Sequence, residues 1–277
     1  MCCLCTEGHV VHTLPEGRPV FGVTTLGDEI YLLRRKENDL VEVYDVITYH
    51  LLRCLTAPPN IRSINDMTSC KHFLCLYISD PRSNCVHRLD LQGSANKWPV
   101  YDEPDSLSVN ASHSLIVTCR KVRKIKEFSP RGDLLRDVIL PADIVNPWHA
   151  IQLTNGQFIV CHGKRDDSVH RVCRVSEDGR HFQSQGGQPG SSTGQYNVPV
   201  HLAVDSNELV FVSDLINRRV KLLSPTLNYV RQVVSCDQIQ WLPDRLCLDV
   251  QRRRLYVADN ECQDGKFTAG RVVVFAV

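Results

Sequence analysis

Short runs of apolar residues alternate with polar residues along the whole chain, and the runs recur in groups of three or four. The clearest group lies between Gln183 and Leu223. In it, Pro199 is followed by an apolar run that ends near Asp205, a second run that ends at Asp214, and a third run after Asn217. Alternation over four to eight residues is typical of half-buried β-strands. The group therefore predicts a small antiparallel sheet.

The same skeleton recurs, less completely, five more times. In the last copy Pro243, Asp249 and Asp259 repeat the spacing of the first group, and the other copies begin near Pro19, Pro59, Pro104 and Pro147. A unit that recurs at roughly 40–50 residues indicates propeller blades. The predicted fold is all-β: a single six-bladed β-propeller of four-stranded blades over residues 1–277. In the second blade, the inner strand is expected within residues 59–66, and Met67–His72 is expected to be an insertion.

The two ends of the chain predict a closed ring. The last copy ends with only a third strand, Arg271–Val277, and Val10–Leu14 stand where an outer strand precedes the proline in other copies. If the first strand completes the last blade, no sheet edge is left exposed. Residues 1–8, which contain three cysteines, are expected to form a flexible tail.

The most complete copy resembles the NHL repeat, the propeller unit at the C-terminus of many tripartite-motif proteins. The matching residues are Gly187, Gly190, Gly194, Gln195-Tyr196, Pro199, Leu202-Ala203-Val204-Asp205, Val212-Ser213-Asp214, Asn217 and Arg219-Val220. The resemblance implies a propeller that binds protein, or single-stranded or hairpin RNA. The chain has no RING-type or B-box array of cysteines and histidines, so any link to ubiquitin ligation would come through a partner.

Composition narrows the class of protein. The 277 residues carry 32 Lys and Arg against 31 Asp and Glu, and no apolar run approaches the length of a membrane span. The 13 cysteines are odd in number, irregularly spaced and without a CxxC pair. Reduced, buried thiols in a cytoplasmic protein fit this pattern best. Seven are expected in strands and three, Cys70, Cys85 and Cys262, in loops. An oxidised surface pair and an acylated tail are alternatives.

The repeated acidic positions have a structural explanation. An Asp that ends an inner strand can accept hydrogen bonds from the turn that follows, and Asn tolerates turn conformations that other residues avoid. The positions in question are Asp80, Asp205, Asp214, Asn217, Asp249 and Asp259.

The residue two positions after each proline is expected to line the mouth of the central channel. These residues are Phe21, Ile61, Ser106, His149, His201 and Arg245. Some propeller lyases similar to this pattern hold zinc with channel histidines, and some propeller hydrolases hold calcium with channel carboxylates. Here a third ligand for His149 and His201 is not evident, and Arg245 would repel a cation. The expectation is therefore no cofactor and no metal, with a metal-dependent lyase or hydrolase as the alternative.

Basic residues follow the second strand of most copies. They are Arg34-Arg35-Lys36, Arg82, Arg120-Lys121, Arg123-Lys124, Lys164-Arg165 and Arg218-Arg219. If these turns share a face, that face would attract RNA phosphates, and Phe21, Trp148 and Tyr196 could stack on bases. Interleaved acids such as Asp166 and Asp167 weaken the signal.

A rigid ring with long loops also suits protein recognition, because loops carry most function in such scaffolds. The longest insertions are expected at Met67–His72, Gln183–Gln195 and Asn260–Gly270. The sequence therefore favours a monomeric, non-enzymatic binding or scaffold module that recognises a protein or peptide through its loop-bearing face, with RNA binding as the alternative. The residues expected to contact the ligand are His149, His201, Arg245, Arg34, Arg120, Arg123, Arg218 and Trp148.

Overall fold

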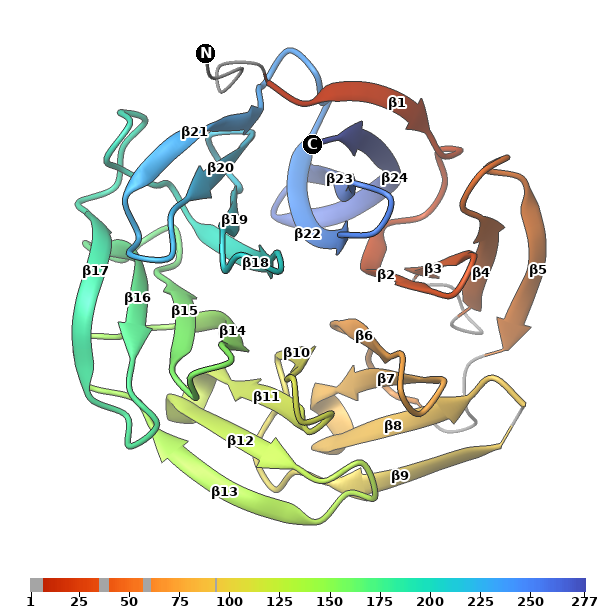
Figure 1. Cartoon of the computed structure of the whole chain (residues 1–277), viewed down its shortest axis with the longest axis horizontal. Helices are drawn as coiled ribbons and strands as arrows, with labels where there is room; N and C mark the ends of the chain where they lie inside the picture. Colours follow the sequence, from red (N-terminus) through yellow and green to blue (C-terminus); the bar gives the residue numbers. More distant parts are fainter. Residues whose placement is uncertain (1–6, 35–39, 57–60, 93) are drawn as a thin grey trace.

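The computed structural model describes residues 7–34, 40–56, 61–92 and 94–277. Over these residues the chain forms six four-stranded antiparallel sheets that radiate from a central axis (Figure 1). The predicted six-bladed β-propeller is confirmed. From the inside outward, the blades are β2 (Val20–Leu26), β3 (Glu29–Arg34), β4 (Leu40–Asp45) and β5 (Leu51–Thr56); β6 (Met67–Cys70), β7 (Cys75–Asp80), β8 (Cys85–Asp90) and β9 (Ala95–Pro99); β10 (Ser106–Val109), β11 (Leu115–Cys119), β12 (Lys124–Phe128) and β13 (Leu134–Ile139); β14 (Pro147–Gln152), β15 (Phe158–His162), β16 (His170–Val175) and β17 (His181–Gly187); β18 (Pro199–Val204), β19 (Val210–Asp214), β20 (Arg219–Leu223) and β21 (Tyr229–Val234); and β22 (Leu242–Asp249), β23 (Arg254–Gln263), β24 (Lys266–Ala276) and β1 (His9–Thr13).

The predicted closure of the ring is confirmed. Strand β1 pairs antiparallel with β24, with His9 opposite Ala276 and Thr13 opposite Val273, and the two strands lie side by side in Figure 1. Of the expected tail, residues 1–6 lie outside the described residues. Gly8 is buried, and its N–H donates to the Val233 carbonyl at 2.8 Å, so the ordered chain begins before residue 9.

The strand directions divide the connections between two faces of the ring. The segments that link one blade to the next lie on the same side as the turns after each second strand, because the strands alternate in direction. We call this side the entry face. The turns after the first and third strands lie on the opposite side, which we call the exit face. Two of the entry-face turns begin with 3-10 helices of three residues, η1 (Pro81–Ser83) and η2 (Arg120–Val122).

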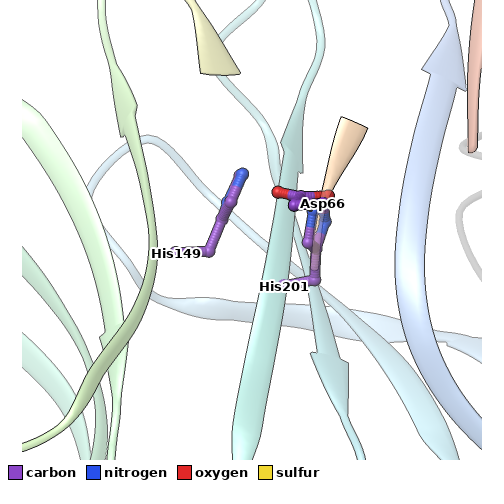
Figure 2. Close-up of side chains that lie close together, drawn as sticks. All are labelled: Asp66, His149 and His201. Carbon is purple, nitrogen blue, oxygen red and sulfur yellow. Dashed lines mark ion pairs between the residues drawn. The ribbon is translucent and has the colours of Figure 1, made fainter. Parts of the chain in front are cut away.

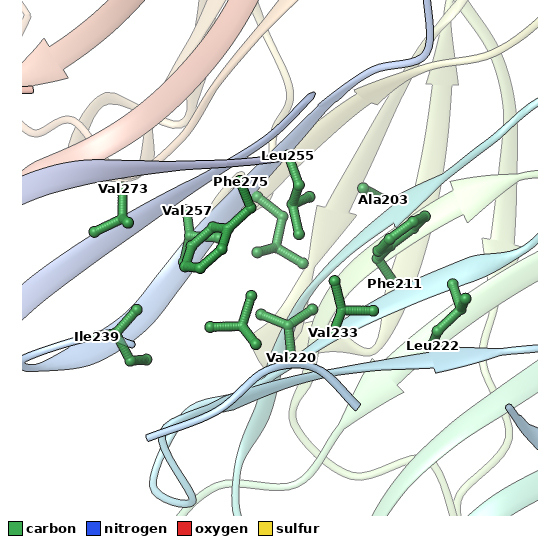
Figure 3. Close-up of a cluster of buried hydrophobic side chains, with 12 residues drawn as sticks. Ala203, Phe211, Val220, Leu222, Val233, Ile239, Leu255, Val257, Val273 and Phe275 are labelled. Carbon is green, nitrogen blue, oxygen red and sulfur yellow. The ribbon is translucent and has the colours of Figure 1, made fainter. Parts of the chain in front are cut away.

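The hydrophobic core consists of clusters between neighbouring blades. The cluster between blades 5 and 6 contains Phe211 from β19, Val257 from β23 and Phe275 from β24 (Figure 3). An equivalent cluster fills each of the other interfaces. Each blade therefore needs its neighbours to bury its two apolar faces, as in other repeat folds.

The acidic residues of the repeat fasten the backbone, but Asp214 and Asp259 bind backbone N–H groups of the segment that enters the blade and not, as predicted, of the turn that follows. Asp214 accepts from the Asn197 N–H at 2.7 Å, and Asp259 accepts from the Trp241 N–H at 2.7 Å. Both bonds hold the segment that enters the blade to the end of its second strand. Asp205 instead accepts from the turn that follows it, through the Leu209 N–H at 2.8 Å.

In blade 4 the same fastening position is occupied by a histidine. His162 is fully buried, and its Nδ1 lies 3.2 Å from the Val145 carbonyl of the entering segment. Burial lowers the pKa of His162 to about 4. The neutral ring, with its proton on Nδ1, therefore donates to that carbonyl.

We expect this histidine to make folding sensitive to acid. Between pH 6.5 and 4 the unfolded chain binds a proton that the folded protein excludes, so stability falls as the pH is lowered through this window, by up to about 3 kcal/mol. Urea unfolding at pH 7 and pH 4.5 should therefore show a smaller acid loss for His162→Gln than for the original chain. Equal acid losses in the two proteins would contradict this.

Three details of the predicted strands are wrong. The inner strand of blade 2 is β6, which begins at Met67 in the expected insertion, because Asp66 and Met67 continue the ladder opposite Ser79 and Ile78. Three cysteines expected in loops, Cys70, Cys85 and Cys262, lie in strands. One expected in a strand, Cys236, lies in a turn.

The ten described cysteines are all free thiols. Of the helices in the described part of the chain, none could span a membrane.

Candidate functional site

The inner strands present equivalent side chains around the central channel. In blade 4 His149 is opposite Cys161, and in blade 5 His201 is opposite Ser213, each after a β-bulge that follows the first proline of the strand. The strand registers extend this position around the ring. Its six members are Gly22, Asp66, Ser106, His149, His201 and Arg245.

The predicted channel position is correct in blades 3 to 6 and wrong in the first two. In blade 1 Phe21 is the bulged residue, and its ring packs against Phe267 at 6.1 Å between centroids, so Gly22 takes the channel position. A side chain at Gly22 would collide with Met67, since an added Cβ would lie 2.5 Å from the Met67 Cβ. In blade 2 the position belongs to Asp66, five residues beyond Ile61.

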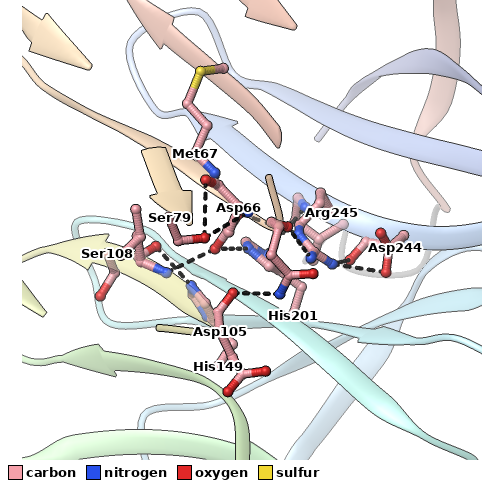
Figure 4. A network of polar contacts seen from close by, with 12 residues as sticks. Asp66, Met67, Ser79, Asp105, Ser108, His149, His201, Asp244 and Arg245 are labelled. Atoms are coloured by element: carbon pink, nitrogen blue, oxygen red, sulfur yellow. Dashed lines mark hydrogen bonds and ion pairs between the residues drawn. The ribbon is translucent and has the colours of Figure 1, made fainter. Parts of the chain in front are cut away.

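A charged network closes the channel on the entry-face side (Figure 4). The guanidinium of Arg245 lies 3.2 Å from Asp66 and 2.8 Å from Asp244, and it donates to the Asn65 carbonyl at 2.7 Å. Arg245 thus crosses the channel from blade 6 to blade 2. Asp66 also accepts from the Leu107 N–H of blade 3 at 2.8 Å. All these charged side chains are buried.

Burial and charge set the protonation of the two carboxyl groups. Burial disfavours the Asp66 carboxylate, but contact with His201 and the charge of Arg245 outweigh it and lower the pKa of Asp66. For Asp244, burial prevails over Arg245 and raises the pKa. The arginine is the counter-charge that both carboxyl groups share.

The two predicted histidines come together beside Asp66. Their rings are stacked, with centroids 3.9 Å apart and planes 23° from parallel, as Figure 2 shows. His149 Nε2 donates to the Leu107 carbonyl at 3.2 Å, and burial holds the pKa of His149 well below its usual value. His201 Nδ1 accepts from the Leu246 N–H at 3.3 Å, so Nε2 carries the proton and faces Asp66 at 3.8 Å.

Asp66 is a third potential metal ligand beside the two histidines, and sequence reasoning did not find it. One donor atom from each of Asp66, His149 and His201 lies within 4.8 Å of the others. The ring geometry opposes coordination, however. An imidazole nitrogen binds a metal in the plane of its ring, and the planes of two stacked rings do not meet close to both nitrogens. A cation would also have to displace Arg245 from Asp66. As arranged, the cluster is held by the contacts of Asp66 with Arg245 and His201, and His149 Nδ1 is buried without a hydrogen-bond partner among the described residues.

A cavity of about 240 Å³ extends from the histidine pair along the channel axis. Strands from all six blades line it, and Ile151, Val204 and Leu248 stand near the ends of their strands at the exit face. The histidines form its inner end, and its walls are mostly apolar. The cavity is large enough for a few water molecules or a small side chain.

The expected exposure of Arg34 on a basic face is wrong. Arg34 is 1% exposed, and its Nε pairs with Glu42 at 2.7 Å. Its other nitrogens donate to the carbonyls of Pro15 at 2.8 Å and Gly270 at 3.0 Å. The arginine occupies the fastening position of blade 1 and is not available to an external ligand. Arg35 and Lys36 lie outside the described residues.

The other basic turns do share the entry face, but internal contacts use several of them. Arg218 donates to the carbonyls of Ile239 at 2.7 Å and Trp241 at 3.2 Å, and Arg219 pairs with Asp214 at 2.7 Å. Arg123 is exposed, and its guanidinium touches the Ala142 carbonyl at 3.3 Å. The face is therefore less basic than its sequence indicates.

Arg120 and Trp148 form a unit of their own. The guanidinium of Arg120 lies 4.1 Å from the centre of the Trp148 ring and 3.2 Å from Asp105. The indole nitrogen of Trp148 donates to the Gly163 carbonyl at 3.0 Å. Phe21 and Tyr196 are buried, and Trp148 is half-buried and covered by Arg120, so the three aromatic residues expected to stack on bases are engaged within the protein.

A groove of about 610 Å³ opens on the entry face between blades 5 and 6. The extended hairpin of β23 and β24 forms one wall, and the turn after β19 forms the other. Ile216, Trp241 and Leu242 give the groove an apolar side, while Arg165 and Asp264 stand exposed at its rim. The hairpin lies in the predicted insertion Asn260–Gly270, although the insertion is strand and turn and not an irregular loop.

Three examples of solved structures have a fold similar to that of this chain. Virginiamycin B lyase from Staphylococcus aureus, as a catalytically inactive variant with quinupristin, has a TM-score of 0.65 and 10% identity over 98% of this chain and 99% of that chain. The Cps50 (Swd1) propeller domain of Myceliophteria thermophila has a TM-score of 0.63 and 13% identity over 98% and 100% of the two chains. Hydrazine synthase of Kuenenia stuttgartiensis has a TM-score of 0.62 and 13% identity over 94% and 97%.

The chain has the β-propeller fold. At these identities the similarity shows the fold alone. No protein family and no curated protein matches the sequence, so the resemblance to NHL repeats and tripartite-motif proteins is not confirmed beyond the propeller.

Sequence reasoning missed two elements of the candidate sites. Asp66 was not predicted, because the segment before β6 is longer than in other blades and separates the proline from the channel position. The groove escaped because Ile216 and Leu242 are distant in sequence and meet only across a blade interface. A signal for the groove was present in the length of the Asn260–Gly270 insertion.

Proposed function

We propose that this propeller is a non-enzymatic binding module that recognises an extended segment of another protein in the entry-face groove. The observation that carries the proposal is the groove itself, about 610 Å³ in volume, with Ile216, Trp241 and Leu242 along one side and charges at the rim. Apolar anchors that include tryptophan, surrounded by polar residues, are typical of protein interfaces. A monomeric state and a cytoplasmic location remain predictions.

The hairpin suggests how a peptide would bind. Strand β22 pairs with β23 as far as Leu242 opposite Asn260, so the last residues of β23, Glu261–Gln263, have only β24 beside them among the strands that the structure describes. An extended peptide can add a strand to such an edge, with main-chain hydrogen bonds providing affinity. One apolar side chain of the peptide would then fill the space beside Ile216 and Leu242.

Charge favours protein over RNA as the ligand. Glu261 and Asp264 line the groove and would repel phosphates, whereas an acidic and a basic side chain of a peptide could meet Arg165 and Asp264. Arg218, which also lines the groove, and Arg34 and Arg219 outside it are engaged by carbonyl and carboxylate groups, which reduces the basic surface that phosphates need.

The test is selection of peptides from a random-sequence display library, followed by affinity measurement with fluorescent peptides. We expect the selected peptides to share one apolar position, and Ile216→Asp to weaken their binding at least tenfold, equivalent to about 1.4 kcal/mol. The reason is that the new carboxylate would place charge against the apolar anchor.

The matched control is Leu51→Asp, which makes the same change at a residue 52% exposed on the outer strand β5. This control should leave the affinity unchanged. Equal loss in both variants, or selection of no peptide, would refute the groove. Tight, steeply salt-dependent binding of single-stranded RNA that Arg123→Ala removes would favour the RNA alternative.

A further inference from the structure

A buried carboxylate recurs at the entry-face end of three blades, and in two of them a neighbouring arginine neutralises it. Asp214 lies opposite Arg219, with the two side chains 2.7 Å apart, and Asp259 lies opposite Arg271 at 3.0 Å. These two carboxylates and the third, Asp80 of blade 2, are fully buried. A buried charge without a counter-charge is costly, which explains the paired arginine.

Blade 2 breaks this pattern. Its carboxylate, Asp80, lies opposite Cys85 in the strand register, where blades 5 and 6 have arginine. Two residues further along β8 is His87, where blade 5 has Lys221. Both cationic positions have thus been replaced by residues that bind metals. No ion pair of Asp80 with lysine or arginine occurs within the described part of the chain; its one ionisable partner there is His87.

The three side chains lie close together. His87 Nε2 is 3.4 Å from the Cys85 Sγ and 3.5 Å from the Asp80 Oδ2. Cys85 is 6% exposed, His87 is 1% exposed and Asp80 is fully buried. One donor atom from each of the three side chains lies within 4.8 Å of the others, around the Asp80 carboxylate. Backbone N–H groups of Arg62 and Ser63 contribute to its stabilisation at 2.9 and 3.0 Å.

These distances match the edges of a tetrahedral zinc site. With zinc–sulfur bonds of about 2.3 Å and zinc–nitrogen or zinc–oxygen bonds of about 2.1 Å, neighbouring ligands lie about 3.4–3.6 Å apart. Thiolate, imidazole and carboxylate are all zinc ligands, and one thiolate with one carboxylate would balance the charge of Zn²⁺. The channel cluster of His149, His201 and Asp66 lacks this zinc-like geometry. Its two imidazole rings are stacked, and Arg245 already neutralises the Asp66 carboxylate.

We propose that Asp80, Cys85 and His87 bind a zinc ion at the entry-face end of blade 2. The ion takes the place of the arginine that neutralises the equivalent carboxylate in blades 5 and 6. Binding releases the proton of the Cys85 thiol to solvent, and a water molecule completes the four ligands. The ion links β7 to β8 across the turn that contains η1.

The test is titration of metal-free protein with Co²⁺, which substitutes for zinc and gives a charge-transfer absorption band when a thiolate binds it. The background carries Cys2→Ser, Cys3→Ser and Cys5→Ser, so that the N-terminal cysteines do not contribute. We expect one bound Co²⁺ per chain with a thiolate band, displaced by Zn²⁺, and a higher melting temperature with Zn²⁺.

Cys85→Ser should abolish the thiolate band, and His87→Gln should weaken Co²⁺ binding at least tenfold. Two controls should retain the band: Cys75→Ser, at a buried thiol on the adjacent strand, and His149→Ala/His201→Ala in the channel. Circular dichroism checks that each variant folds; if Cys85→Ser does not, the His87→Gln result decides. Absence of the band in the starting protein, its persistence in Cys85→Ser, or its loss in the channel variant would overturn the proposal.

Discussion

Removal of residues 1–14 should leave a protein that is largely insoluble or unfolded at 25 °C. The truncation deletes β1, which completes blade 6, and Leu14, which is fully buried between blades 6 and 1. Loss of a buried leucine alone costs about 2–5 kcal/mol, a large part of the total stability of a typical domain. In addition β24 becomes an exposed sheet edge, which promotes aggregation.

Two smaller changes separate the contribution of strand β1 from that of the Leu14 side chain. Deletion of residues 1–6 leaves β1 and Leu14 in place and should not change the melting temperature. Leu14→Ala keeps the strand and should lower the free energy of unfolding by the leucine contribution only. Soluble expression and thermal melting measure both effects. A 1–14 truncation that melts at the temperature of the full chain would show that β1 does not hold the ring together.

Arg245→Met should lower the free energy of unfolding by about 3–5 kcal/mol, the usual result of removing one partner of a buried ion pair. The methionine fills similar space but leaves Asp66 and Asp244 buried without the guanidinium that contacts both. Chemical denaturation at pH 7 measures the loss. The effect should exceed that of Arg123→Met, where the arginine is exposed on the same face.

The pH dependence distinguishes lost charge from lost packing. Without Arg245, the pKa values of both carboxyl groups should rise in the folded variant, so the folded variant takes up protons at a higher pH than the original protein. The stability difference between the two proteins should therefore shrink as the pH falls from 7 to 5. Adding Asp66→Asn to Arg245→Met should also recover part of the loss at pH 7. A difference that is constant with pH would indicate that packing alone is responsible.

The repeat pattern was sufficient to predict the blades because each blade, apart from β1, is built from strands that pair with their neighbours in sequence. Placing individual side chains needed more. A proline marks the channel position where it begins the inner strand, as Pro147 and Pro199 do. It fails where the proline stands one residue too early, as Pro19 does before Val20, or where the connecting segment is longer, as before Asp66.

Charge was harder to predict than position. A run such as Arg218-Arg219 has the composition of an exposed basic turn, yet each guanidinium is occupied by acceptors from other segments. Arg34 is a stronger example of a charged side chain that the sequence pattern misplaces. It occupies a position that is aspartate in other blades, and Glu42 neutralises its charge. Whether a charged side chain is paired depends on residues far away in sequence, and the local pattern does not contain that information.

The pairing of β1 with β24 also imposes an order in time. During synthesis β1 leaves the ribosome before every other strand of the ring, and its partner β24 leaves after all of them. At about 5–20 residues per second, β1 waits on the order of tens of seconds with its hydrogen-bonding groups unpaired. Blades 1 to 5 can assemble while the chain is growing, but the sixth can be completed only after β24 has been made. For that interval the nascent protein is an open arc whose first strand is free to pair with another chain.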